Sequence, residues 1–157
     1  MLPKAKTMYM TERGFTRLEA ELASLRNEER PALAEYLHDT SAGGESMDNS
    51  ELLLLREELA FIDGRMLELD EILRNAEIIK PGEPDGLVHL GNTVVIQMIG
   101  DIPETYTIVG SAEADPGEGL ISNESPMGKA LLDHAVGDDV TVATPSGEMS
   151  FRIVAVT

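Results

Sequence analysis

Four carboxylates gather in one short polar segment, and they are the residues of this sequence with the clearest potential for chemistry. Asp39, Glu45, Asp48 and Glu51 lie in or beside the Gly/Ser-rich stretch SAGGESMDNS, and no Lys or Arg lies between the first and the last of them. Acids without basic neighbours can cap a helix, remain solvated, or present negative charge to a cation or a basic partner. The surrounding sequence has to decide between these roles.

A purely structural role is easiest to argue for Asp48. An Asp followed three residues later by Glu51 resembles a capping box, in which a side-chain oxygen accepts from free amides at the start of a helix. Glu45, which follows a Gly pair, has no obvious capping role. We interpret Asp39 and Glu51 as solvated or helix-dipole residues. For Asp48 both capping and metal binding stay open, and the two roles do not exclude each other.

Other familiar kinds of site are absent from the sequence. The three histidines, His38, His89 and His134, are far apart and lack the spacing of metal ligands. There is no cysteine for a disulfide or a thiolate site. We also find no nucleophile triad, P-loop or dinucleotide-binding fingerprint.

Two helical patterns flank the acidic segment, with apolar residues at alternating spacings of three and four, as in the seam of a coiled coil. After the segment these residues are Leu52, Leu55, Leu59, Ile62, Met66, Leu69, Leu73 and Ala76. Before it they are Leu18, Leu22, Leu25, Ala32, Leu33, Tyr36 and Leu37. Two such helices joined by a turn of about ten residues must lie antiparallel, because only then can their apolar stripes meet. At about 1.5 Å per residue the first helix spans roughly 40–45 Å, so the acidic turn lies far from the other end of the hairpin.

Local signals refine the first helix. Thr11, with Glu12 in the first turn, predicts a helix start, because a hydroxyl can accept from the free amides there. Pro31 lies inside the pattern, and an interior proline removes one backbone hydrogen bond. We expect a kink at this position but no break.

A linker is predicted at residues 80–86, which contain two prolines and two glycines. It separates a hairpin at residues 1–79, with its acidic tip near 39–51, from a second domain at residues 87–157. The fold class expected for the chain is α+β in two domains.

The second domain is predicted to be a sheet with one short helix. The segments NTVVIQMI, ETYTIVG, DDVTVAT and EMSFRIVAV are rich in Val, Ile and Thr and predict strands. The segment TPSGE predicts a hairpin turn between the last two. The segment SPMGKALLDH predicts the helix, with Ser125 as its cap and Pro126 at its first position.

Composition limits the partners. The 157 residues include 29 acids and 12 bases, for a formal charge of −17, so the phosphates of free nucleic acid would meet a repulsive field. We expect weak or no binding to free nucleic acid. No stretch approaches the roughly 18 apolar residues of a membrane span, and the N-terminus is too polar for a signal sequence. The sequence is interpreted as a cytoplasmic protein that contacts no membrane.

Three parts of the sequence resemble one known family, the bacterial transcript-cleavage factors GreA and GreB and their homologues. The opening MTERGFTRLEAELASLRNEERP resembles the start of the family, and LRNAEII resembles the end of its hairpin. The segment LISNESPMGKALLDHAVGDDVTVATPSGEMSFRIVAV resembles its C-terminal signature. The likeness covers nearly the whole chain.

The resemblance implies a long antiparallel coiled-coil hairpin followed by an FKBP-like domain. In this family the C-terminal domain docks on RNA polymerase at the rim of the secondary channel, and the hairpin passes down that channel. Its tip carboxylates help to hold a second Mg²⁺ at the polymerase active site, which cuts backtracked RNA; added charge suits such a two-metal site. The family member itself is not an enzyme, binds no cofactor tightly on its own, and meets nascent RNA only within the elongation complex.

The resemblance also assigns residues. In register, the tip Asp of the family falls on Glu45 and its Glu on Asp48, which are the expected catalytic and Mg²⁺-binding carboxylates acting in the polymerase. Arg56 matches a family arginine that could face RNA or polymerase, and an ion pair with a neighbouring acid is equally open. A further candidate for polymerase contact, which equally suits a local turn and helix start, is the segment Ser125, Pro126, Met127 and Gly128.

The tip departs from the family motif GDLxENAEY and reads GESMDNSEL. The two acids have exchanged lengths, so their reach changes by about one methylene each, and a misplacement near 1 Å can cost about a hundredfold in a catalytic geometry. Two functions therefore stay open: a factor that stimulates RNA cleavage, or a homologous inhibitor or regulator that occupies the channel without promoting cleavage. A hairpin adaptor unrelated to transcription is a third hypothesis and predicts no polymerase binding.

Overall fold

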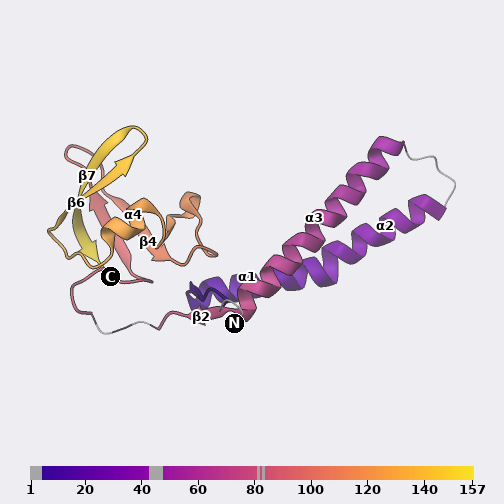
Figure 1. Ribbon diagram of the computed structural model, residues 1–157, viewed down its shortest axis with the longest axis horizontal. Coiled ribbons are helices and arrows are strands. Elements are labelled where there is room, and N and C mark those ends of the chain that lie inside the picture. The colour runs from indigo at the N-terminus through magenta and orange to yellow at the C-terminus, as the bar shows by residue number, and fades with distance from the viewer. Residues whose placement is uncertain (1–4, 43–47, 81, 83) are drawn as a thin grey trace. The chain divides into compact units, whose positions relative to one another are not determined.

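A computed structural model describes residues 5–42, 48–80, 82 and 84–157 of the chain (Figure 1). By its internal packing the chain divides into two units. One is the helical segment Phe15–Asn75, and the other combines the residues up to Gly14 with Ala76–Thr157. Both ends of the segment predicted as a hairpin therefore group with the C-terminal part of the chain.

The helical unit is a hairpin of two long arms (Figure 1). The first arm comprises α1 (Glu12–Ser24), whose first turn belongs to the other unit, a π-helical segment (Leu25–Glu29) and α2 (Arg30–Ala42). The second arm is α3 (Asn49–Arg74), whose 26 residues make it about 39 Å long. None of the helices in the described part of the chain has the length and apolarity needed to cross a membrane.

Helix α1 starts where the sequence predicts. The Thr11 hydroxyl oxygen accepts a hydrogen bond from the backbone N–H of Gly14 at 3.0 Å, which satisfies one of the free amides of the first turn.

The seam between the arms follows the predicted spacing in part. Its buried side chains are Leu18, Leu22, Leu25, Ile62, Leu69 and Ile72. Of these only Ile72 was not predicted; its predicted neighbour Leu73 is half-buried. Ala32 and Tyr36 were expected in the seam, but both are exposed. They follow the π-helical segment, whose wider turn changes the angular position of the residues after it relative to an uninterrupted α-helix.

Pro31 does not break the first arm, as predicted. The residues just before it form the π-helical segment, in which the N–H of Arg30 donates to the carbonyl of Leu25, five residues earlier. Such π-helical turns are a recognised cause of local distortion in helices. The irregularity expected near Pro31 is thus a local switch from α-helical to π-helical hydrogen bonds.

A short parallel sheet pairs the segment before α1 with the segment after α3. Strand β1 (Met8–Met10) pairs with β2 (Ala76–Ile78). Helix α3 ends at Arg74 because the side-chain amide of Asn75 donates to the Glu71 carbonyl at 2.8 Å and closes the last turn. The prediction that Ala76 belongs to the helical seam is therefore wrong; strands this short carry too little periodicity to be seen in the sequence.

The C-terminal part contains a five-stranded sheet with the strand order β5-β4-β3-β7-β6 (Figure 1). Its strands are β3 (Thr93–Gln97), β4 (Glu104–Val109), β5 (Leu120–Ser122), β6 (Asp139–Thr144) and β7 (Gly147–Val156). Strand β4 pairs with β5 in parallel, and the other pairs are antiparallel. Four of the five strands match the predicted segments, and β5 was missed.

One α-helix accompanies this sheet in the described residues, as predicted, and a short 3₁₀ turn (Pro116–Glu118) precedes β5. Helix α4 (Pro126–Leu131) is shorter than the segment SPMGKALLDH, and its residue Leu131 is fully buried in the core. The core side chains, which come from the sheet, α4 and the segment before β3, are Val88, Val94, Ile96, Ile108, Ile121, Leu131, Val140, Val142, Phe151 and Ile153. The predicted α+β class, with a helical hairpin followed by a sheet domain that carries one short helix, is confirmed.

The predicted linker, residues 80–86, contains no helix or strand among its described residues; Pro81 and Glu83 lie outside them.

Candidate functional site

Asp48 lies directly before α3 and caps it. Its side chain is exposed, its backbone is non-helical (φ −57°, ψ 141°), and its Oδ1 accepts from the N–H of Ser50 at 3.4 Å. The capping role predicted for this residue is therefore confirmed, with Ser50 rather than Glu51 as the donor. The bond is long for an N–H···O contact, and it uses one of the two carboxylate oxygens. Capping and a second role for the carboxylate are compatible in this geometry.

The other acids of the tip divide between the two arms. Asp39 is exposed near the end of α2, and Glu51 is exposed in the first turn of α3. Glu45, the second carboxylate assigned by the resemblance, lies outside the described residues. Within the described ranges, no group of three or more His, Asp or Glu side chains is arranged to hold a metal ion.

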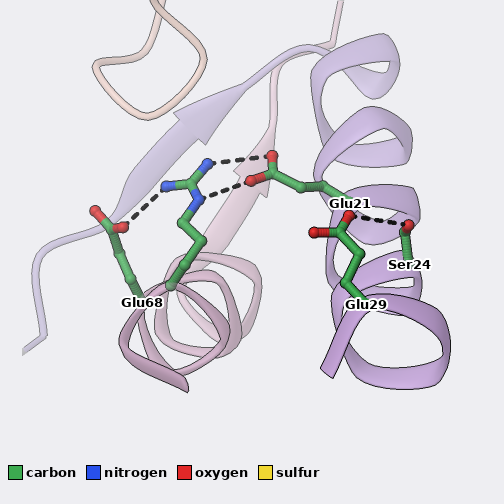
Figure 2. Close-up of polar contacts among 5 residues, drawn as sticks. Glu21, Ser24, Glu29 and Glu68 are labelled. Atoms are coloured by element: carbon green, nitrogen blue, oxygen red, sulfur yellow. Dashed lines mark hydrogen bonds and ion pairs between the residues drawn. The ribbon is translucent and has the colours of Figure 1, made fainter. Parts of the chain in front are cut away.

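Among the described residues of the hairpin, three arginine–carboxylate pairs connect the two arms. Arg65 on α3 donates to Glu21 on α1, with Nε–Oε1 at 2.7 Å and Nη2–Oε2 at 3.1 Å. Figure 2 shows Glu21 and, on the other side, Glu68, which accepts from Arg65 Nη1 at 2.9 Å. The remaining two pairs are Arg26 with Asp70 and Arg30 with Asp63.

In two of these pairs, Arg65–Glu21 and Arg30–Asp63, two guanidinium nitrogens donate to the two carboxylate oxygens, whereas Arg26 contacts both oxygens of Asp70 through Nη2 alone. The hydrogen bond that Arg65 donates to Glu21, opposed by partial desolvation, raises the pKa of Arg65 above its ordinary value, so this guanidinium stays charged. In each of the three pairs at least one side chain is more than a third exposed, so each pair contributes modestly to the stability of the fold. Together they join α1, the π-helical segment and α2 of the first arm to α3 of the second.

Arg56 is exposed on α3, eight residues after Asp48. It forms no ion pair with any residue in the described part of the chain, so the predicted alternative of a local ion pair is not found. Its guanidinium is available to an external partner.

The segment Ser125–Gly128 has a structural role that the sequence allowed. The Ser125 hydroxyl donates to the Ser122 carbonyl at 2.6 Å and accepts from the N–H of Gly128 at 3.0 Å. Gly128 is buried, and a Cβ there would lie 2.1 Å from the Ser122 carbonyl oxygen. Met127 is half-buried against the core, whereas Pro126 is exposed. Of these four residues, Pro126 is the one whose side chain is exposed.

Sequence reasoning did not single out Glu113, a polar residue that is 4% exposed. Its carboxylate accepts from the backbone N–H and the hydroxyl of Thr11, just before α1. A buried carboxylate so distant in sequence from its partner leaves no local signal, and only the folded chain reveals it.

Comparison with known proteins agrees with this arrangement. Residues 8–78 match the family profile described as "Transcription elongation factor, N-terminal", and residues 83–157 match "Transcription elongation factor, GreA/GreB, C-term". The transcription elongation factor GreA of Listeria monocytogenes is 45% identical over 154 residues, which are 97% of this chain and 96% of that protein. GreA of Bacillus licheniformis is 45% identical over 157 residues, 99% of both chains. Among solved structures, the GreA factor homolog Gfh1 of Thermus thermophilus is 32% identical, covers 97% of this chain and 99% of its own, and superposes with a TM-score of 0.46.

A long helical hairpin with an acidic tip, joined to a small sheet domain, defines the architecture of a transcription elongation factor of the Gre type. The chain belongs to the GreA/GreB family.

Proposed function

We propose that this protein binds bacterial RNA polymerase, inserts its hairpin into the secondary channel, and stimulates cleavage of backtracked RNA by the polymerase active site. The single observation that carries the proposal is the position of Asp48. An exposed carboxylate lies at the tip end of a helix about 39 Å long, in a hairpin braced by three pairs of charged residues. Family membership supports the choice of partner and reaction.

The hairpin suits delivery of a carboxylate to a distant site. Isolated helices of this length fray, and a rod that positions a reacting group must resist bending. Here the buried seam around Leu69 and the pairs made by Arg26, Arg30 and Arg65 join the two arms. The protein itself needs no active centre, because the chemistry takes place in the polymerase.

Glu45 and Asp48 are the residues that would share a Mg²⁺ with the polymerase. The donor set fits, since Mg²⁺ takes oxygen ligands and commonly uses one or two carboxylates together with water and substrate phosphates. At a two-metal site the ion stabilises charge on the attacking and leaving oxygens. Capping occupies Oδ1 of Asp48 and leaves its Oδ2 outside that bond.

Charge supports binding through protein contacts. A chain of net charge −17 repels free RNA and DNA, so nascent RNA is met only inside the elongation complex, in the cytoplasm where polymerase works. The candidate contacts are Arg56 on α3, which forms no ion pair with the described residues, and the exposed Pro126 on α4. Steering of the acidic tip toward basic groups would make association sensitive to salt.

The test is cleavage of end-labelled RNA in a backtracked elongation complex with the cognate polymerase and Mg²⁺. Wild type should accelerate cleavage, and Glu45→Ala/Asp48→Ala should abolish the acceleration while still binding polymerase. The matched control is Asp39→Ala, which removes an equivalent exposed charge near the tip and should leave cleavage unchanged.

The same assay decides between the two functions that the altered tip leaves open. If wild type binds polymerase, fails to accelerate cleavage and slows nucleotide addition, the protein is a channel-occupying regulator. Absence of any polymerase binding would contradict both functions and favour an adaptor outside transcription.

A further inference from the structure

The π-helical segment Leu25–Glu29 separates two parts of the first arm that do not follow one α-helical spacing. Up to this segment the buried residues lie four and three positions apart, as in an α-helical seam: Leu18, Leu22 and Leu25. Continued without interruption, the same spacing would bring to the seam Glu29, Ala32 and Tyr36. All three of these residues are exposed.

The seam resumes one position later in the sequence. The residues that follow Glu29, Ala32 and Tyr36 directly are half-buried, and they are Arg30, Leu33 and Leu37. Arg30 also reaches the second arm through its ion pair with Asp63. The same displacement at each point indicates that the first arm contains one inserted residue, which the wider π-helical turn accommodates. In an uninterrupted α-helix, the residues after it would be rotated by about 100° about the helix axis.

Contacts within the first arm agree with an inserted residue. The N–H of Arg30 donates to the carbonyl of Leu25, five residues earlier, where an α-helix uses the carbonyl four residues earlier. Figure 2 shows Ser24 beside Glu29, also five residues apart, with 3.5 Å between Ser24 Oγ and Glu29 Oε1. Pro31 follows directly, and in a regular α-helix its ring would clash with the carbonyl four residues earlier. The proline and the inserted residue therefore favour the same irregular turn.

Helix α3, which the structure describes in full, has no matching insertion. It is α-helical from Asn49 to Arg74, and its apolar residues keep the alternating spacing of three and four from Leu52 to Leu69. The extra residue therefore belongs to the first arm alone. The π-helical segment thus decides which residues of α2 lie on the seam with α3.

The insertion has a consequence at the tip, because the two tip acids are attached to different arms. Asp48 directly precedes α3, whereas Glu45 belongs to residues 43–47, which connect α2 to Asp48. A slip of one residue in the first arm would move the end of α2 at Ala42 by about 3.8 Å, the distance between successive Cα atoms. A misplacement near 1 Å can already cost about a hundredfold in a catalytic geometry.

We propose that the π-helical segment is a positioning element for the tip. By accommodating one inserted residue, it keeps Leu33 and Leu37 on the seam and brings the end of α2 to the place from which the chain must enter the tip for cleavage. This inference rests on the proposed function, since that function supplies the reaction. It assigns a role to a part of the rod that touches neither metal nor RNA.

The first test removes the inserted residue and measures cleavage of backtracked RNA at saturating protein. Deletion of Glu28 is combined with Pro31→Ala, so that a straight α-helix can form. Leu33 and Leu37 then lie at the α-helical spacing from Leu25, and the end of α2 keeps its place. This variant should cleave at the rate of Pro31→Ala alone, which should match wild type because its seam leucines are unchanged.

The matched control deletes Glu57 in the same Pro31→Ala background. Glu57 is an exposed glutamate like Glu28, so the two deletions change composition and charge equally. Helix α3 has no inserted residue to lose, so this deletion displaces Asp48 by one residue. Cleavage at saturating protein should slow about 10- to 100-fold.

The second test keeps the length of the chain and moves the seam. The shifted-seam variant, Ala32→Leu/Leu33→Ala/Tyr36→Leu/Leu37→Tyr with Pro31→Ala, gives the first arm the spacing of an uninterrupted α-helix. The end of α2 is then displaced by one residue, and cleavage at saturating protein should slow about 10- to 100-fold. Further deletion of the exposed His38 returns the end of α2 to its place and should restore cleavage. Thermal melting verifies that each variant is folded, and the concentration for half-maximal stimulation separates a loss of rate from a loss of binding.

The outcomes separate this inference from the proposed function. Undiminished cleavage by the shifted-seam variant would overturn the inference and leave the proposed function standing. Slow cleavage that deletion of His38 does not restore would do the same, because the exchanged side chains and not their position would then be responsible. Slow cleavage after deletion of Glu28 would show that the segment does more than accommodate a residue, and would also overturn it. Failure of wild type to accelerate cleavage would overturn the proposed function together with the inference.

Discussion

The carboxylate of Glu113 accepts a hydrogen bond from the backbone N–H of Thr11 at 2.8 Å, across 102 residues of sequence. The same carboxylate accepts from the Thr11 hydroxyl, whose oxygen in turn accepts from the N–H of Gly14. Glu113, in the loop after β4, thus binds Thr11, and Thr11 binds the N–H of Gly14, so the two side chains together cap the start of α1. The first helix of the hairpin therefore begins on a contact supplied by the C-terminal half of the chain.

Replacing Glu113 with Ala should destabilise the protein. The change leaves the N–H of Thr11 without this partner in a partly buried position and removes a side-chain cap, at a cost of about 1–3 kcal/mol. Urea unfolding followed by circular dichroism measures this. Glu118→Ala, at an exposed acid in the same half of the chain, is the control and should shift the midpoint very little; an equal shift in both would contradict the capping role.

Gly14 and Gly64 are both helical glycines, but substitution by Ala should change the stability of the protein in opposite directions at the two positions. A Cβ at Gly14 would lie 2.2 Å from the Glu113 carboxyl carbon, whereas a Cβ at Gly64 meets nothing within 4 Å. Ala is favoured over Gly inside a helix by about 1 kcal/mol. Gly64→Ala should therefore raise the melting temperature and Gly14→Ala should lower it. Stabilisation by both substitutions would mean that the loop carrying Glu113 moves aside at little cost.

Burial in the seam should decide how much an Ala substitution on α3 lowers the stability of the protein. Leu69 is fully buried, and Leu69→Ala should reduce the free energy of unfolding by about 2–5 kcal/mol, because a buried side chain is lost and a cavity remains. Leu67, two residues earlier, is 71% exposed, so Leu67→Ala should change stability by less than about 0.5 kcal/mol. Chemical denaturation of both variants checks this, and similar losses at the two positions would show that the buried face of α3 is misassigned.

Glu124 predicts a local pH dependence. Hydrogen bonds from Lys6 and Ser111 hold the pKa of the Glu124 carboxyl below its ordinary value. Because the folded pKa is the lower one, the contact contributes above the ordinary carboxyl range and is lost as the pH falls through the lowered pKa. A carbon-13 NMR titration should show this low value, and Lys6→Ala should raise it toward the ordinary one. An unchanged titration in the variant would show that Lys6 makes no contribution in solution.

Restoring the family's order of acids at the tip should increase the rate of RNA cleavage. If the exchanged lengths of its two acids limit metal alignment, Glu45→Asp/Asp48→Glu should speed RNA cleavage in a backtracked complex, by up to about a hundredfold. This exchanged variant keeps an acid at each position, so the net charge is unchanged. The cleavage assay described above measures this with Asp39→Glu as the control. Slower cleavage by the exchanged variant would show that Glu45 and Asp48 already match this polymerase.

The sequence by itself determined the elements with long or regular patterns. The spacing of leucines around Leu22 and Leu69 predicted two antiparallel helices, because one apolar stripe of a helix must be buried against another. Alternating Val, Ile and Thr predicted four strands of the sheet, and Ser125 with Pro126 predicted the start of α4. The acidic tip was visible because its charges have no basic neighbours in the chain.

Only the tertiary structure decided the features that depend on contacts between distant residues. Strands β1 and β2 exist because they pair with each other, and three-residue segments have no period to recognise. Tyr36 is exposed and does not belong to the seam, because the π-helical turn before Pro31 changes the angular position of the residues that follow it. Glu113 caps a helix only because the fold brings it to Thr11, which lies 102 residues earlier. Ile99 lies beside a recess only because the fold brings it near Phe151. Local pattern fixes which segments become helices and strands, whereas burial and capping depend on which segments meet.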